Sequence, residues 1–480
     1  MSHAWSADEI KRVGYRAIDL IAEHLTSLRD KPVFQPFPQE RATAYMNAPP
    51  PEMGQSADEI LAAFERDIAP YPFGNGHPRF YGWVNSPPVV MSVFAEALAA
   101  AMNPSCAGGS HAAIYVERQV LNWFKHITGF PRDSMGLLVS GGSMAALTAL
   151  AVARHVKCGF DVRAKGVQEA PRRLVFYKSG EGHGCHQKAI ELLGIGHENL
   201  RVIPHNAGQQ MVPAALDAAI HEDVAHGRTP VAVIASAGTV NTGAIDPLDE
   251  IADICARHSV WFHVDGAYGA PAILTTRYAK ALAALARADS LALDPHKWLY
   301  VPVEAGLVLV RDADAMRAAF SLVPPYLRTV EGVGGLPWFS EYGVQQTRGF
   351  RALKVWMALR YHGLAGYRTA IEHDLALADR LASTIQAAPD FQLFEPHSLS
   401  IVCFRYVPAA AGRDPDALRL DALNKAILEK VQLGGRVFLS STVVGGAFWL
   451  RACIVNPRAQ EQDVDSVLDA VRDAAHAIVM

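Results

Sequence analysis

The middle of the chain, from about residue 86 to 370, alternates short apolar runs with longer stretches whose apolar residues recur at helical spacing. Such alternation is typical of β-α-β units, in which consecutive strands lie parallel in one sheet. Seven runs have the length and composition of strands: 137–140, 173–177, 200–204, 231–236, 260–264, 290–293 and 306–310. We therefore predict an α/β domain with a seven-stranded, mostly parallel sheet and helices on both faces.

The two ends of the chain have different patterns. Residues 1–85 show helical periodicity interrupted by proline-rich stretches and have no strand pattern, so this segment would not fold well alone. Residues 371–480 mix both periodicities, with helices expected at 371–388 and 464–478 and strands at 400–406, 436–440 and 448–454. We expect three parts: a helical segment (1–85), a large α/β domain (86–370) and a small α+β domain (371–480).

Composition narrows the classes of partner. The 480 residues carry a formal net charge of -4 and no long run of basic residues, which favours neither nucleic acid nor an anionic membrane as a partner. Residues 2–28 read as an amphipathic helix and not as a signal peptide. The most apolar stretch, 87–102, is interrupted by Glu96 and is too short to cross a bilayer. We expect a cytoplasmic protein that acts on small molecules.

The cysteines argue for neither disulfides nor a metal. All six lack the close pairing of a disulfide or zinc framework, so reduced thiols are expected. Possible zinc ligands cluster at His183, Cys185 and His186, with His197 further on. A structural zinc site would need a second spaced pair of ligands, so we predict no metal.

Chemically useful residues follow five of the predicted strands. They are Gly142 and Ser143 after the first strand, His183 after the second, Thr239 after the fourth, Asp265 after the fifth and Lys297 after the sixth. Carboxyl ends of parallel strands share one edge of an open sheet, and ligands bind there. The pattern therefore predicts that these side chains converge on one ligand.

Lys297 and Asp265 indicate which ligand that is. Pyridoxal phosphate needs an amine that forms a Schiff base with its aldehyde and a carboxylate that keeps its ring nitrogen protonated. Glycines ahead of the predicted helix 144–156 would let backbone N–H groups approach its phosphate. Apolar neighbours predict that Lys297 is partly buried, with a lowered pKa. Singly, these residues could also be turn glycines, a helix cap and a surface lysine.

Four sequence stretches carry a resemblance over nearly the whole chain: HPRFY at 77–81, the glycine loop at 139–150, DPHKW at 294–298 with HVDGAY upstream at 263–268, and FRALKVW at 350–356. Together they resemble the pyridoxal-phosphate-dependent group II decarboxylases, nearest the aromatic-L-amino-acid decarboxylase branch. This resemblance implies a fold type I enzyme that decarboxylates an L-amino acid. It also implies a homodimer with active sites at the interface, in which the N-terminal helical segment serves dimerisation.

The resemblance implies roles for individual residues. Lys297 would hold the cofactor, Asp265 would pair with its ring nitrogen and His183 would stack on the ring. The full set of cofactor-binding residues would be Gly142, Ser143, His183, Thr239, Asp265, Ala267, Asp294, His296 and Lys297. Asp294 stands where the animal enzymes have asparagine. Tyr326, before a glycine-rich stretch suited to a lid, would protonate the alpha carbon and so favour an amine product over an aldehyde.

Substrate identity is the most open point. The residues that would meet the substrate are Trp83, Ser86 and Thr347, and several other positions of the expected pocket are small or polar: Asn75, Val84, Asn103 and Ser105. Aromatic amino acids are the leading expectation, and histidine, diaminobutyrate and an acidic amino acid stay open. Outside decarboxylation, an aldehyde-forming relative, an aminotransferase or aldolase, and a catalytically silent homologue are the alternatives.

Overall fold

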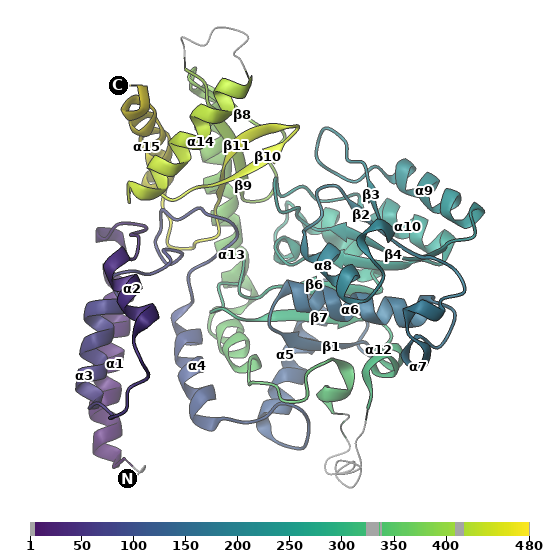
Figure 1. Cartoon of the computed structure of the whole chain (residues 1–480), viewed down its shortest axis with the longest axis horizontal. Helices are drawn as coiled ribbons and strands as arrows, with labels where there is room; N and C mark the ends of the chain where they lie inside the picture. The colour runs from purple at the N-terminus through teal and green to yellow at the C-terminus, as the bar shows by residue number, and fades with distance from the viewer. Residues whose placement is uncertain (1–4, 323–335, 337, 409–416, 480) are drawn as a thin grey trace. The chain divides into compact units, whose positions relative to one another are not determined.

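The computed structural model describes residues 5–322, 336, 338–408 and 417–479 (Figure 1). The chain forms two compact units. The large unit comprises Val84–Asp379 and Phe394–Val402, and the small unit comprises Met1–Trp83, Arg380–Leu393 and Cys403–Met480. The sequence-based division into three parts stays a prediction.

A seven-stranded sheet, in the order β1-β7-β6-β5-β4-β2-β3, forms the centre of the large unit. The strands are β1 (Met135–Val139), β2 (Leu174–Ser179), β3 (Leu200–Ile203), β4 (Thr229–Ser236), β5 (Trp261–Asp265), β6 (Ser290–Leu293) and β7 (Gly306–Val310). Only β7 runs against its neighbours in this sheet. Because β1 and β6 are both antiparallel to β7, the carboxyl ends of β1 to β6 lie at one edge. The predicted mostly parallel sheet is confirmed.

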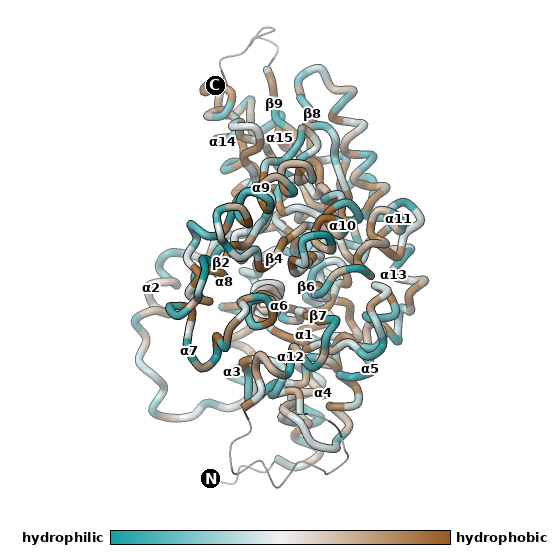
Figure 2. The backbone as a smooth tube through the Cα atoms, turned by 90° about the vertical axis from the view of Figure 1, so that its right-hand side faces the viewer, coloured by the Kyte–Doolittle hydropathy of each residue, from teal (hydrophilic) through white to brown (hydrophobic). Residues whose placement is uncertain are grey.

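Helices cover the sheet, and this explains why its strands are almost continuously apolar. Every residue of β1, β2 and β7 is buried, as expected for strands covered on both faces. Helix α6 packs against β1 and β4 to β7, α9 packs against β3 and β4, and α10 packs against β4 and β5. Figure 2 shows hydrophilic and hydrophobic residues side by side along helices such as α9 and α10. The α-helices of this unit are α4 (Val90–Met102), α5 (Ala112–Thr128), α6 (Gly142–Lys157), α7 (Val162–Lys165), α8 (Cys185–Leu192), α9 (Pro213–Ala225), α10 (Leu248–His258), α11 (Ala279–Leu282), α12 (Ala313–Phe320) and most of α13 (Ala352–Ala387).

The reversal of β7 has a local cause. A parallel return to the sheet requires a crossover of a dozen or more residues, usually with a helix. The connection from β6 to β7, residues 294–305, contains turns and no helix. The chain therefore turns back beside β6, and this short connection carries Lys297.

The small unit combines helices with a four-stranded sheet in the order β10-β11-β9-β8. Its elements include α1 (Ala7–Ser27), α2 (Gln39–Asn47), α3 (Ala57–Ala63), β8 (Phe391–Leu393), most of β9 (Ile401–Tyr406), α14 (Ala417–Leu433), β10 (Ser440–Val444), β11 (Ala447–Cys453) and α15 (Glu461–Val479). The strand expected at 436–440 is wrong: Phe438 instead packs with Val33 and Phe80, and the strand begins at Ser440. Helix α13 (Ala352–Ala387) starts well before the expected residue 371 and changes direction at Gly363.

Among the helices in the described ranges, none combines the length and apolar character needed to span a membrane.

Candidate active site

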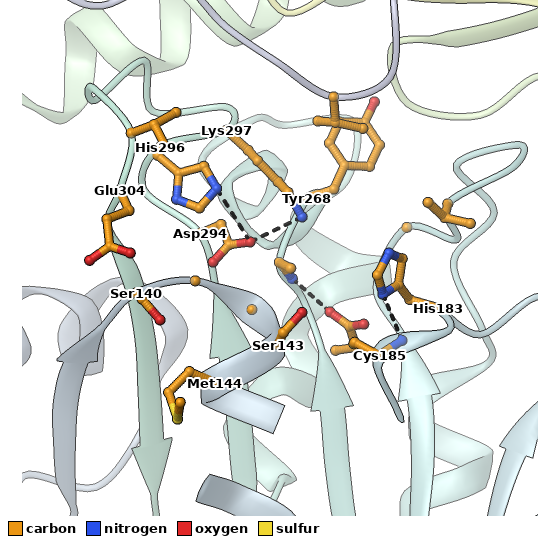
Figure 3. A pocket seen from close by; sticks show the side chains of 18 of the residues that line it. Ser140, Ser143, Met144, His183, Cys185, Tyr268, Asp294, His296, Lys297 and Glu304 are labelled. Carbon is orange, nitrogen blue, oxygen red and sulfur yellow. Dashed lines mark hydrogen bonds and ion pairs between the residues drawn. The ribbon is translucent and has the colours of Figure 1, made fainter. Parts of the chain in front are cut away.

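A cavity of about 380 Å³ opens at the carboxyl edge of the large sheet (Figure 3). Most of its lining follows the ends of β1, β2, β4, β5 and β6. The lining residues are Ser140, Gly141, Gly142, Ser143, Met144, His183, Cys185, Ser236, Gly238, Val240, Asp265, Ala267, Tyr268, Asp294, His296 and Lys297, together with Val84, Val303 and Glu304. The structure thus brings together nearly all of the residues that the strand pattern predicted to converge.

The start of α6 lines this cavity and is suited to binding an anion. Gly141 is the N-cap and so offers no side chain to cap the helix, which leaves backbone N–H groups of the first turn for a ligand. A Cβ atom added at Gly142 would lie 2.9 Å from Asp294 Oδ2 and 3.2 Å from the Ala267 Cβ. A side chain at this position would force Asp294 to shift, because the loop packs tightly against the residues after β5 and β6.

Lys297 points into the cavity toward Asp294, and its Nζ lies 3.0 Å from Asp294 Oδ2 (Figure 3). Burial alone would lower the pKa of Lys297, but the carboxylates of Asp294 and Asp265 outweigh it, and the pKa is raised. The expected lowered pKa is therefore wrong. The sequence could not reveal this, because the shift depends on how close the two carboxylates come in the folded chain.

Asp265 ends β5 and is held in place from two sides. Its Oδ1 accepts a hydrogen bond from the backbone N–H of Ala267 at 3.1 Å, and its Oδ2 lies 3.1 Å from His186 Nε2. Burial would raise the pKa of Asp265, but the His186 contact, Lys297 and the Ala267 N–H hold it well below its usual range. The cavity therefore contains a carboxylate that stays ionised.

His186 and Cys185 make up a part of the site that the sequence suggested only as possible zinc ligands. Both lie in the first turn of α8, and His186 is fully buried. The contact between His186 and Asp265 joins residues far apart in the chain, and no local sequence pattern reveals it. The prediction that the protein uses no metal stays a prediction.

Two histidines flank the cavity. The Nδ1 of His183 accepts a hydrogen bond from the Cys185 backbone N–H at 3.1 Å, which fixes the ring beside the cavity (Figure 3). The Nδ1 of His296 lies 2.8 Å from the Ala305 carbonyl oxygen, and its Nε2 is 3.8 Å from Asp294 Oδ2. Both rings are thus oriented by the backbone.

Other predicted site residues lie elsewhere or outside the described ranges. Thr239 is buried but does not line the cavity, and its hydroxyl accepts a hydrogen bond from Ala244 N–H within its own turn. Ser86 donates to the carbonyl oxygen of His296 at 3.1 Å. Thr347 is exposed, and Trp83, in the small unit, stacks on Phe73.

Tyr326 lies outside the described residues, as does most of the expected lid, so both stay predictions.

The conserved domain of pyridoxal-dependent decarboxylases matches residues 39–407. The chain belongs to the pyridoxal-dependent decarboxylase family. It is 35% identical to an aromatic-L-amino-acid decarboxylase of Bacillus atrophaeus, across 98% of this chain and 97% of that protein. It is 30% identical to the human acidic amino acid decarboxylase GADL1, across 85% of this chain and 79% of that protein. The resemblance seen in the sequence motifs is confirmed.

A solved structure confirms the fold assignment. The decarboxylase superposes on a structure described as Oryza sativa TDC with PLP and tryptamine, with a TM-score of 0.91, 26% identity and full coverage of both chains. The protein is thus a fold type I, pyridoxal-phosphate-dependent amino-acid carboxy-lyase.

The residues of the cavity fit that cofactor. The uncapped start of α6 provides N–H groups for a phosphate, Asp265 provides an ionised carboxylate for a ring nitrogen, and Lys297 provides an amine. All three occur in one cavity of the large unit.

Proposed function

We propose that this decarboxylase converts an aromatic L-amino acid to its amine. The observation that carries the proposal is the cavity lining, which combines apolar side chains such as Val84, Val240 and Val303 with no arginine among the described lining residues. An acidic substrate side chain would need a fixed cation besides Lys297, which holds the cofactor. The Bacillus atrophaeus relative, named an aromatic-L-amino-acid decarboxylase, supports the same substrate class.

When bound, pyridoxal phosphate withdraws electrons from the bond that loses carbon dioxide. Gly142 and Ser143 would hold the phosphate through the start of α6, with His296 beside it. His183 and Ala267 would position the ring, and Asp265 would keep a proton on its nitrogen by remaining ionised. The position of these residues in the cavity lining supports these roles.

Asp294 accepts the proton that Lys297 must lose. Because the pKa of Lys297 is raised, its Nζ is protonated at neutral pH and must lose a proton before it can act as a nucleophile. Asp294 Oδ2, 3.0 Å away, is positioned to hold that proton, and it also fixes the direction of Nζ. An asparagine at this position could orient Nζ but could not take its proton.

The proposal also names the residues that contact the substrate. They are Ser86, Thr347 and Trp83. Tyr326 delivers the proton to the alpha carbon, so the product is the amine and not the aldehyde. Thr239 supports the cofactor through the turn that it stabilises.

An acidic amino acid is the second candidate, because GADL1 is 30% identical to this chain. The deciding experiment compares kcat/KM for tryptophan, tyrosine, phenylalanine and dopa with that for aspartate, glutamate, histidine and diaminobutyrate. We expect an aromatic substrate to have the highest value. A higher kcat/KM for an acidic, histidine or diaminobutyrate substrate would overturn the aromatic assignment.

We also propose a homodimer whose active sites lie at the subunit interface. Large apolar side chains on α1 are exposed, with Ile10 57%, Tyr15 68% and Ile18 42% exposed, and a second copy would bury such a surface. The test mixes two variants that are each expected to form no amine, Lys297→Ala and Tyr326→Phe, after reversible dissociation. If Tyr326 acts in the site of the other subunit, mixed dimers regain amine formation. If mixing restores none, although mass analysis shows that mixed dimers form, the shared-site arrangement is wrong.

We also propose that the protein is cytoplasmic. This location is supported by the spacing of the six cysteines in the sequence, which does not suggest a disulfide framework, as expected of a chain that folds in a reducing compartment. Fractionation of cells with an antibody to the protein tests it, and recovery in a membrane or secreted fraction would contradict it.

A further inference from the structure

His186 contacts Asp265 from the interior of the protein. Its side chain is fully buried, and Nε2 lies 3.1 Å from Asp265 Oδ2. Asp265 lines the cavity, whereas His186 does not. The carboxylate therefore has one oxygen near a buried histidine and the other hydrogen-bonded to the backbone of Ala267.

The surroundings of His186 favour a charged ring. Neither ring nitrogen has a well-aligned hydrogen bond among the described residues, so a neutral imidazole would leave both polar atoms buried and unsatisfied. An imidazolium is attracted to the nearby carboxylate even when the angle is poor. Cys185 Sγ, one ring nitrogen of His186 and one carboxylate oxygen of Asp265 all lie within 4.8 Å of one another.

The electrostatics of these groups agree with the geometry. Burial lowers the pKa of His186, but Asp265 and Cys185 raise it to about 10. Burial raises the pKa of the Cys185 thiol, but His183 and His186 lower it to about 6. These shifts favour a positively charged His186 beside the Asp265 carboxylate and the Cys185 thiol.

Other charged or titratable groups near His186 do not cancel this effect. His263, on β5, has its ring centre 6.4 Å from that of His186, and burial together with the His186 charge lowers its pKa to about 3, so it stays neutral. Lys178, at the end of β2, donates to the Gly182 carbonyl oxygen at 3.1 Å. Lys297 acts on Asp265 in the same direction as His186.

We propose that His186 is a positioning residue that keeps the proton off Asp265, so that an anionic carboxylate faces the nitrogen of pyridoxal phosphate. This inference rests on the proposed role of Asp265. Without His186, Asp265 would lose the largest of the contacts that lower its pKa, and its carboxyl group would compete more strongly with the cofactor nitrogen for the proton. Because His186 lies outside the cavity lining, its action on the cofactor is indirect.

The first test measures the protonation state of His186 directly. Full-length protein with ¹⁵N-labelled histidine is examined by NMR between pH 6 and 8.5, with and without pyridoxal phosphate. The His186 signals are assigned as those missing from His186→Gln. We expect an imidazolium that does not titrate in this range, and in Asp265→Asn a titration that moves below pH 8. A His186 ring that is neutral at pH 7 in the wild-type protein would overturn the proposal.

The second test measures the affinity of the full-length protein for pyridoxal phosphate from pH 5.5 to 8.5. His186→Gln should weaken binding about tenfold near neutral pH, as expected for the loss of one charge-assisted contact. The pKa of Asp265 should be higher in His186→Gln than in the wild type, so the loss of affinity should grow as the pH falls toward that pKa. His197→Gln is the matched control, because it removes an exposed histidine that pairs with Glu191, and it should leave the affinity unchanged.

The outcomes separate this proposal from the proposed function. A His186→Gln effect that is equal at every pH would indicate a structural role only, and unchanged affinity would leave His186 without a role, so either result overturns the proposal. If the NMR and affinity results hold but no aromatic amine is formed, the proposed function fails and the His186 assignment stands. If His186→Gln does not fold, the histidine NMR signals that differ between the wild type and Asp265→Asn still show whether His186 is protonated.

Discussion

Replacing Arg348 with methionine removes the positive partner of a buried carboxylate. The guanidinium of Arg348 pairs with Glu117 of α5, and the two side chains are 1% and 0% exposed. Arg348 also donates to the carbonyl oxygens of Cys106 at 2.9 Å and Leu138 at 2.7 Å. The Arg348→Met variant loses all of these bonds. The Glu117 carboxylate then keeps the hydrogen bond that it accepts from the Leu138 backbone N–H at 3.0 Å.

The size of the effect follows from two opposing contributions. Hydrogen bonds to a charged group contribute about 1.5–3 kcal/mol each, but the variant no longer pays to bury a guanidinium. Removing one partner of a buried pair costs about 3–5 kcal/mol, a large share of the roughly 5–15 kcal/mol of a typical protein. Because Leu138 lies just before Ser140, the variant should also bind pyridoxal phosphate more weakly.

Urea unfolding followed by circular dichroism measures the loss as a shift of the midpoint. Arg12→Met is the matched control, because it breaks an exposed pair with Asp58, and it should leave the midpoint unchanged. The double variant Glu117→Gln with Arg348→Met keeps an oxygen for the Leu138 N–H and removes the buried charge. It should therefore be more stable than Arg348→Met alone. A double variant whose loss equals the sum of the single losses would refute the reasoning, since the two side chains would then be energetically independent.

Three further predictions concern the cofactor loop, pH and the product. Gly142→Ala should weaken the binding of pyridoxal phosphate about tenfold. Gly184→Ala, whose added Cβ meets nothing within 4 Å, should leave the affinity unchanged. Equal affinities of the two variants in a pyridoxal phosphate titration would contradict this prediction. Burial and the charge of Arg79 lower the pKa of His77 to about 4, so the folded protein resists protonation that the unfolded chain accepts below about pH 6.5. Between neutral pH and pH 5, this group should lower the free energy of unfolding of the wild type by about 2 kcal/mol. Urea unfolding should show that His77→Gln lacks this part of the pH dependence. Tyr326→Phe should shift the product from amine to aldehyde, and an unchanged amine yield by mass spectrometry would exclude its role.

The large sheet could be predicted from the sequence because its strands are buried on both faces. Continuous apolar runs such as β6 and β7 were located at their observed ends, since burial on two faces leaves few polar residues inside the run. The small sheet was harder. In β10 buried and exposed residues alternate, and the apolar Phe438 just ahead of it packs elsewhere, which displaced the predicted strand.

The candidate site was predictable where it depends on strand order and not where it depends on distances. Asp265 and Lys297 follow strands that end at the same edge, so their convergence follows from topology. The raised pKa of Lys297 depends on a 3.0 Å approach of Asp294, and the state of Asp265 depends on His186. Such contacts join side chains through the fold, and periodicity along the chain contains no information about them.

The most direct test of the central claim identifies the products of the purified full-length protein with pyridoxal phosphate. Each L-amino acid of a panel is supplied singly, and amines, aldehydes, keto acids and carbon dioxide are quantified by mass spectrometry. We predict one amine and one carbon dioxide per aromatic amino acid consumed, with both lost in Lys297→Ala. Aldehyde or keto acid as the sole organic product would contradict the decarboxylase account.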